Sequence, residues 1–114
     1  MRSMRGSFSH KSIIRVIAIY CKIHKNQNGT VFAACDEEIL GKTLKQGTIE
    51  FFVSEKFYKE EKVSEQELRK RLKSFDNINL IGNKAVQIAI EEQLLDEKSI
   101  LYIEKIAHAQ IFRI

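Results

Sequence analysis

The sequence predicts an α+β fold: a two-layer sandwich in which two main helices cover one face of a mostly antiparallel sheet. Two observations predict it. Segments rich in β-branched residues come first and last in the chain, and two segments with helical apolar spacing lie between them. The 114 residues suffice for one hydrophobic core and are too few for two ordinary domains. We therefore expect a single domain over residues 13–114, preceded by a basic N-terminal arm over residues 1–12.

The first two strands are predicted to form a β-hairpin. The run 13–25 and the following TVFAAC are both strand-like, and Asn28-Gly29 between them supplies the positive φ of a tight turn. The turn length decides how the two cysteines lie. A loop of two or four residues puts Cys21 and Cys35 on opposite faces of the sheet, and a three-residue loop puts them directly opposite each other. The sequence leaves these registers open.

A second hairpin is predicted around Gln46 and Gly47, because the TIEFFV strand that follows alternates apolar and polar side chains over most of its length. Ser54 is then placed to cap a short helical turn through SEKFYKE. Such a turn would send Phe57 and Tyr58 back toward the core.

Two helices are predicted for the middle of the chain. Ser64 and Glu67 have the spacing of a capping box, and an apolar stripe follows them. After a linker of sequence FDNINLIG (75–82), Asn83 is expected to cap a second helix through KAVQIAIEEQL. The tail 99–114 is predicted to form one or two more strands.

Positive charge is concentrated at the N-terminal end. No Asp or Glu precedes Asp36, so residues 1–35 carry a net charge of +6, and the remainder carries −2. Each Lys or Arg that neutralises a phosphate releases counterions, which makes such a segment a recurrent nucleic-acid feature; a solvated terminus explains the charge equally well. A free arm is disordered by itself, and ribosomal RNA is the partner that most often orders such tails. We therefore expect a cytoplasmic RNA-associated protein of the translation machinery, with ribosomal RNA or ribosomal proteins as partners.

The RNA-binding candidates come from this segment and from the basic end of the first predicted helix. They are Arg2, Arg5, Lys11, Arg15, Lys22, Lys25, Arg69 and Arg71. Possible base-stacking rings are Phe8, Tyr20 and Phe32. For the two helical arginines, favourable interaction with the helix dipole is the simpler explanation.

Other common chemistries find no support in the sequence. Gly41-Lys42-Thr43 resembles the end of a phosphate-binding loop, but Asp36 stands where that loop needs a glycine. The two Cys and three His show no metal-ligand spacing, so neither a metal nor a cofactor is predicted. The apolar run 13–20 is too short to span a membrane and is broken by Arg15, so no membrane association is predicted.

Three segments in fixed order resemble a known family. CDEEILGKTLKQGTIEFFVSEKFY, NLIGNKAVQIAI and the terminal HAQ are similar to the archaeal family known as domain of unknown function 424, over roughly residues 20 to 113. The resemblance implies a small single-domain archaeal protein with an α/β fold and no settled activity. Its pattern falls on Cys35, Asp36, Leu40, Gly41, Phe57, Tyr58, Asn79, Gly82, His108 and Gln110. Where the family commonly has Gly and Pro, this chain has Lys105-Ile106-Ala107, which predicts a less sharply turned loop before His108.

The alternative function is a small binding protein or a thiol-dependent enzyme. It requires the Cys35 thiol to meet the His108 imidazole, with Asp36 or Gln110 orienting the base. A cysteine after an apolar strand is more often simply buried, so we rank this site below RNA association. A protein adaptor is a third possibility, and it would carry an apolar surface patch instead of a basic one.

Overall fold

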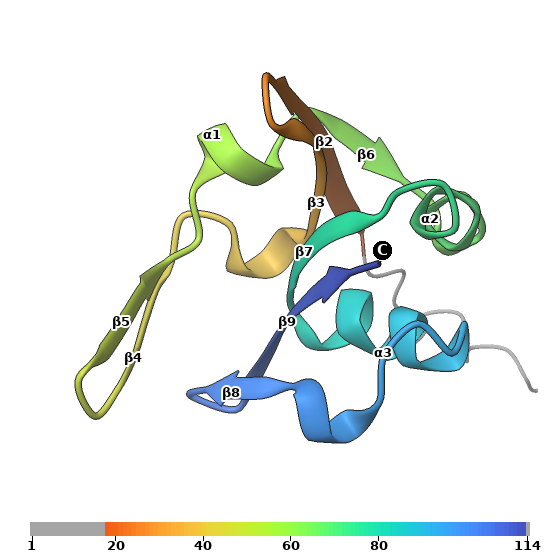
Figure 1. The fold of residues 1–114 in the computed structure, drawn as a ribbon. Helices are drawn as coiled ribbons and strands as arrows, with labels where there is room; N and C mark the ends of the chain where they lie inside the picture. Colours follow the sequence, from red (N-terminus) through yellow and green to blue (C-terminus); the bar gives the residue numbers. More distant parts are fainter. Residues whose placement is uncertain (1–17, 114) are drawn as a thin grey trace, which may run out of the picture.

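Six strands form the main sheet of the computed structural model, which describes residues 18–113 (Figure 1). They are β2 (Ile19–Asn26), β3 (Gly29–Asp36), β6 (Glu61–Val63), β7 (Asn77–Ile81), β8 (Leu101–Ile103) and β9 (Ile106–Phe112). Their order across the sheet is β6-β2-β3-β7-β9-β8. Only β3 and β7 are paired in parallel among these strands, and the other neighbours are antiparallel. The predicted α+β class with a mostly antiparallel sheet is confirmed.

Two helices, α2 (Glu65–Leu72) and α3 (Asn83–Glu91), cover one face of this sheet, as predicted (Figure 1). Leu68 and Leu72 of α2 and Val86 and Ala89 of α3 pack with the apolar side chains of that sheet face, and all four are buried. A 3-10 turn, η3 (Glu97–Ser99), leads from α3 toward β8. Within residues 18–113, no helix is both long and apolar enough to cross a membrane.

The segment between β3 and β6 covers part of the opposite face, for which the sequence predicted no cover. It contains η2 (Glu37–Ile39), the hairpin strands β4 (Thr43–Gln46) and β5 (Ile49–Phe52), and α1 (Glu55–Tyr58). Figure 1 shows the β4–β5 hairpin extending away from the main sheet. A second apolar cluster forms beneath this segment, in which Val53 and Tyr58 meet Cys35 and Ile81 of the sheet. The predicted second hairpin and the Ser54-capped turn are confirmed.

The predicted linker 75–82 is wrong, because most of it forms β7, an interior strand between β3 and β9. Ile78 and Leu80 point to the helix-covered core and are fully buried. The segment does alternate polar and apolar side chains from Asn77 to Leu80, but asparagine is uncommon in strands, and this composition favoured a linker. Asn79 is held on the opposite face by Tyr58, whose hydroxyl donates to Asn79 Oδ1 at 2.5 Å.

Both turns that close the sheet hairpins contain two residues. Asn26 pairs with Gly29 in the first hairpin, so Cys21 and Cys35 lie on opposite faces, which is one of the registers left open. Residues 1–17, which include the predicted arm, lie outside the described part of the chain. The turn before β9 is sharp, contrary to the prediction from its lack of Gly and Pro. Glu104 and Lys105 both adopt left-handed conformations, with φ of 51° and 68°.

Candidate functional site

Asp36, at the end of β3, caps helix α3. Its carboxylate accepts hydrogen bonds from the backbone N–H groups of Lys84 and Ala85, each at 2.9 Å. Burial raises the pKa of Asp36 above its ordinary value, and the two N–H groups act in the opposite direction. A carboxylate that binds free N–H groups at a helix N-terminus has a structural role.

The prediction that Asn83 caps this helix is wrong, because the Asp36 carboxylate accepts the hydrogen bonds of the helix N-terminus. The Asn83 side chain instead holds β9: its Oδ1 accepts from Ala107 N–H at 2.8 Å, and its Nδ2 donates to the Lys105 carbonyl at 3.2 Å. Gly82, at the N-cap position, has a φ of 120°. A Cβ atom there would lie 2.4 Å from Asp36 Cγ, so the close contact between β3 and α3 requires glycine.

Cys35 is fully buried and does not have the surroundings of a nucleophile. Its thiol donates to the Asp36 carbonyl at 3.1 Å. Burial raises the pKa of Cys35 to about 12, and the neighbouring Asp36 charge adds to this. Reactive cysteines instead have a depressed pKa and partial exposure.

His108 does not meet Cys35. The two residues pair with Ile81 from opposite sides, so they are two strand spacings apart, roughly 10 Å. The His108 ring packs against Phe51 with 4.9 Å between ring centroids, and burial lowers its pKa. The structure therefore places the three residues of the alternative site near one another without forming a thiol–imidazole pair. Within residues 18–113, no three His, Cys, Asp or Glu side chains are grouped as metal ligands would be.

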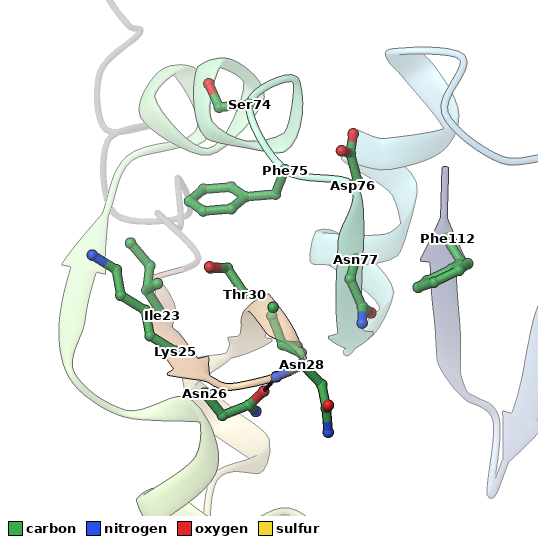
Figure 2. Close-up of a pocket in the computed structure, with 12 residues that line it drawn as sticks. Ile23, Lys25, Asn26, Asn28, Thr30, Ser74, Phe75, Asp76, Asn77 and Phe112 are labelled. Atoms are coloured by element: carbon green, nitrogen blue, oxygen red, sulfur yellow. Dashed lines mark hydrogen bonds between the residues drawn. The ribbon is translucent and has the colours of Figure 1, made fainter. Parts of the chain in front are cut away.

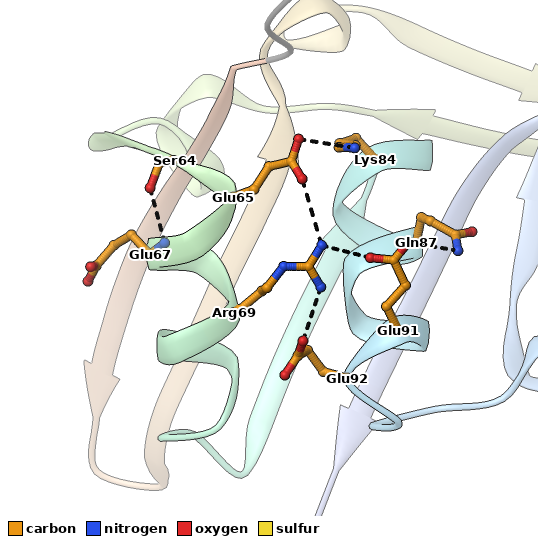
Figure 3. Close-up of polar contacts among 8 residues, drawn as sticks. All are labelled: Ser64, Glu65, Glu67, Arg69, Lys84, Gln87, Glu91 and Glu92. Atoms are coloured by element: carbon orange, nitrogen blue, oxygen red, sulfur yellow. Dashed lines mark hydrogen bonds and ion pairs between the residues drawn. The ribbon is translucent and has the colours of Figure 1, made fainter.

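Arg69 and Arg71 are engaged by carboxylates. Arg69 joins α2 to the end of α3, with Glu91 at 2.7 Å and Glu92 at 3.0 Å (Figure 3). Arg71 makes a two-pronged pair with Glu61 of β6, both contacts at 2.8 Å. RNA binding by these arginines stays a prediction, but the ion pairs give them a structural role and offset their charge.

Lysines gather near Tyr20 on the face of the sheet that carries α1, two of them over its ring and one, Lys56, joined through its backbone carbonyl. This lysine cluster consists of Lys22, Lys56, Lys59, Lys62 and the Tyr20 ring. The ammonium groups of Lys59 and Lys62 lie 5.5 Å and 5.6 Å from the ring centroid. Lys22 donates to the Lys56 carbonyl at 2.8 Å, which ties β2 to α1.

The sequence indicated Lys22 and Tyr20 as candidates and gave no signal for the other three lysines. They are interspersed with aromatic residues and glutamates in KFYKEEK, and only the packing of α1 and β6 beside β2 gathers them. Of the other predicted rings, Phe32 is fully buried and stacks on Phe75 at 4.8 Å, so it is not available to a base. Arg2, Arg5, Phe8, Lys11 and Arg15 lie outside the described residues.

Comparison with known proteins identifies the family. The family model described as "Protein of unknown function (DUF424)" matches residues 23–114. The chain belongs to the DUF424 family. No curated protein matches it. It is similar in fold to the crystal structure of an uncharacterized conserved protein from the archaeon Methanopyrus kandleri, with 24% identity and a TM-score of 0.69, over 85% of this chain and 94% of that chain.

The positions carried over from the DUF424 pattern lie mostly around β3, β7 and β9. Asp36 and Gly82 meet at the start of α3. Tyr58 is bonded to Asn79, which in turn pairs with Gln110. In this protein of the DUF424 family, these positions thus connect the covering segment, the sheet and α3.

Proposed function

We propose that this protein is an RNA-associated protein of the archaeal translation machinery, working in the cytoplasm and bound to the ribosome through its basic N-terminal segment. The observation that supports the proposal is the lysine cluster around Tyr20. β2, which carries Tyr20 and Lys22, begins at Ile19, shortly after the basic arm in the sequence, so the arm and the cluster are close along the chain.

The chemistry of the cluster suits a phosphate backbone. Its lysines come from the segments of β2, α1 and β6. Lys59 and Lys62 contact the Tyr20 ring, and Lys22 contacts a backbone carbonyl. Lys62 lies 3.6 Å from one carboxylate, that of Glu37. Ammonium groups beside an aromatic ring are the combination that single-strand-binding proteins use, with cations for phosphates and a ring for stacking.

The experiment is a salt titration of binding to archaeal ribosomal subunits and to single-stranded RNA. Deleting residues 1–12 removes three charges, Arg2, Arg5 and Lys11. The slope of log K against log salt should flatten by about 2, since each single-strand phosphate contact contributes ~0.7. The double variant Lys59→Ala/Lys62→Ala should flatten it by about 1.4 for the same reason.

The matched control is Lys98→Ala, which removes an exposed lysine from η3, in the connection between α3 and β8 and away from the cluster (Figure 1). It should leave the slope unchanged. Equal slopes for all variants would show that neither the arm nor the cluster contacts RNA. Failure of the full-length protein to bind either probe at low salt would refute the proposal.

A further inference from the structure

The main sheet opens into a fork at one end. Four parallel pairs join β3 to β7, from Phe32 with Ile78 to Cys35 with Ile81. Beyond Phe32 the β2–β3 hairpin continues to its turn at Gly29, and the β7–β9 ladder continues to Asn77 with Phe112. The β2–β3 pair and the β7–β9 pair therefore separate at this end of the sheet. A cleft of about 670 Å³ lies between the two pairs of strands (Figure 2). We call this space the fork cleft.

Its lining combines amides, aromatic rings, a cation and the carboxylate of Asp76. Figure 2 shows Asn26, Asn28 and Lys25 from the β2–β3 hairpin, Phe75 from the connection between α2 and β7, Asn77 from the start of β7, and Phe112 from β9. The Asn26 side chain accepts from Asn28 N–H at 2.8 Å, which shapes the turn. Among the described residues, the side-chain amides of Asn28 and Asn77 have no hydrogen-bond partner, so their donors and acceptors are open to a ligand.

Phe112 is the most exposed large apolar side chain of the described chain, with 74% of its surface in solvent. Such a ring contributes little to the core and offers a flat apolar face at the cleft. Phe75 is placed differently: one of its faces stacks on Phe32, which fixes it as part of the wall. A site with an exposed ring and open amides is suited to a flat molecule with hydrogen-bonding edges.

We propose that the fork cleft binds a nucleobase of single-stranded RNA, with the base against Phe112, its edge at the amides of Asn28 and Asn77, and Lys25 beside the adjoining phosphate. An amide presents a donor and an acceptor side by side, which is the pattern of a base edge. The inference rests on the proposed function and extends it: the lysine cluster holds the backbone, and the fork cleft holds a base.

The position of the cleft agrees with this division. Strand alternation puts Asn77 and Phe112 on the same face of the sheet as Tyr20 and Lys22, because Lys22, Ala33 and Asn79 form one cross-strand row. β2 carries both Lys22, in the cluster, and Lys25, at the cleft, roughly 10 Å apart along the strand, and the same alternation turns them to opposite faces of the sheet. The Asn77 and Phe112 side of the cleft thus lies on the same face as the cluster, and Lys25 reaches the cleft from the other face.

The direct test uses isotope-labelled full-length protein and the four nucleoside 5′-monophosphates, each at millimolar concentration. At least one nucleotide should shift the side-chain amide signals of Asn28 and Asn77, and ribose 5-phosphate should not. Phe112→Ala should lower the affinity for that nucleotide about fivefold or more, as expected for loss of one stacked base. Phe52→Ala is the control, because Phe52 is also an exposed ring, 60% in solvent, but lies on β5 outside the cleft.

The outcomes separate this inference from the proposed function. Absence of shifts at the fork with all four nucleotides, or identical shifts with ribose 5-phosphate, would overturn the inference even if RNA binds with the expected salt slope. Nucleotide binding in the fork without any RNA binding would support the base site and refute the RNA function. When both hold, Phe112→Ala should lower RNA affinity and leave the salt slope unchanged, since no charge is removed.

Discussion

Asp36 and Gly82 lie against each other where the end of β3 meets the start of α3, and each constrains the other. Asp36→Ala would leave the N–H groups of Lys84 and Ala85 without their acceptor, so we expect a loss of about 1–3 kcal/mol in the free energy of unfolding. Asp36→Asn, which retains an acceptor, should lose less. Urea denaturation measures both, and equal stability of Asp36→Ala and the wild type would show that the cap is dispensable.

Gly82 provides the control for this contact. Gly82→Ala should destabilise the wild type through the clash with Asp36 and through its φ of 120°. In the Asp36→Ala background the clash is smaller, so the same substitution should be less harmful, and the two effects should not add.

The second prediction concerns the thiol of Cys35. Since burial raises its pKa to about 12, almost no thiolate exists at neutral pH, and alkylation under native conditions should be far slower than for a free cysteine. His108→Ala should not change that rate, because Ile81 of β7 lies between Cys35 on β3 and His108 on β9. Mass spectrometry of the alkylated peptides measures the rate. Fast labelling of Cys35 at pH 6 that depends on His108 would restore the thiol-enzyme hypothesis.

The third prediction concerns His108, whose pKa burial lowers from the ordinary 6.5. The unfolded chain then binds more protons below pH 6.5 than the folded chain does, so the free energy of unfolding should fall as the pH drops below that value. The slope from one such group is at most about 1.4 kcal/mol per pH unit, and partial exposure of the ring reduces it. Urea denaturation between pH 7 and pH 5 should show this slope in the wild type and a smaller one in His108→Gln.

At the scale of elements, several side-chain hydrogen bonds anchor α1 to the sheet, and that of Tyr58 reaches the interior strand β7. Tyr58→Phe would remove the hydroxyl that donates to Asn79 at 2.5 Å, and we expect a loss of about 1 kcal/mol. The β4–β5 hairpin and α1 should then exchange their amide hydrogens faster than the rest of the protein. Tyr102→Phe, at a half-exposed ring on β8, is the matched control. Equal exchange in the two variants would contradict the anchoring role.

The two main helices are coupled by charge as well as by packing. Glu91 and Glu92 lie at the end of α3, where the helix dipole disfavours acids, and Arg69 of α2 pairs with both. Figure 3 shows the same guanidinium also approaching Glu65, near the start of α2. The basic run of α2 thus serves first to hold the helices together on the sheet.

At the scale of the whole molecule, the two apolar clusters share the same strands. Alternate residues of β3 belong to different clusters. Ala33 and Cys35 lie in the cluster beneath α1, and Phe32 and Ala34 lie in the cluster beneath α2 and α3. If such a strand unfolds, its side chains are lost from both clusters at once. The domain should therefore unfold as one cooperative unit.

The two cysteines report on this directly, since both are free and each is buried in a different cluster. We expect Cys21 and Cys35 to become accessible to a thiol reagent at the same urea concentration, read by peptide mass spectrometry. Earlier labelling of Cys35 would show that the covering segment detaches on its own.

The sequence by itself determined what depends on neighbouring residues: the α+β class, both hairpins, the Ser54 and Ser64 caps and the apolar stripe of α2. Turn chemistry, capping and periodicity act over a few residues, so they can be read locally. The family could also be identified from the sequence, because its motifs occur in a fixed order along the chain.

Tertiary structure alone decided the candidate sites. Asp36 caps a helix that begins 47 residues later in the chain, Asn83 being the first residue of α3. The pairing through Ile81 separates Cys35 from His108, and the packing of α1 and β6 gathers the lysine cluster. The fork cleft exists because the β3–β7 pairing stops at Phe32 while both neighbouring ladders continue. Strand order and register arise from packing between distant segments, and local periodicity carries no record of which segments those are.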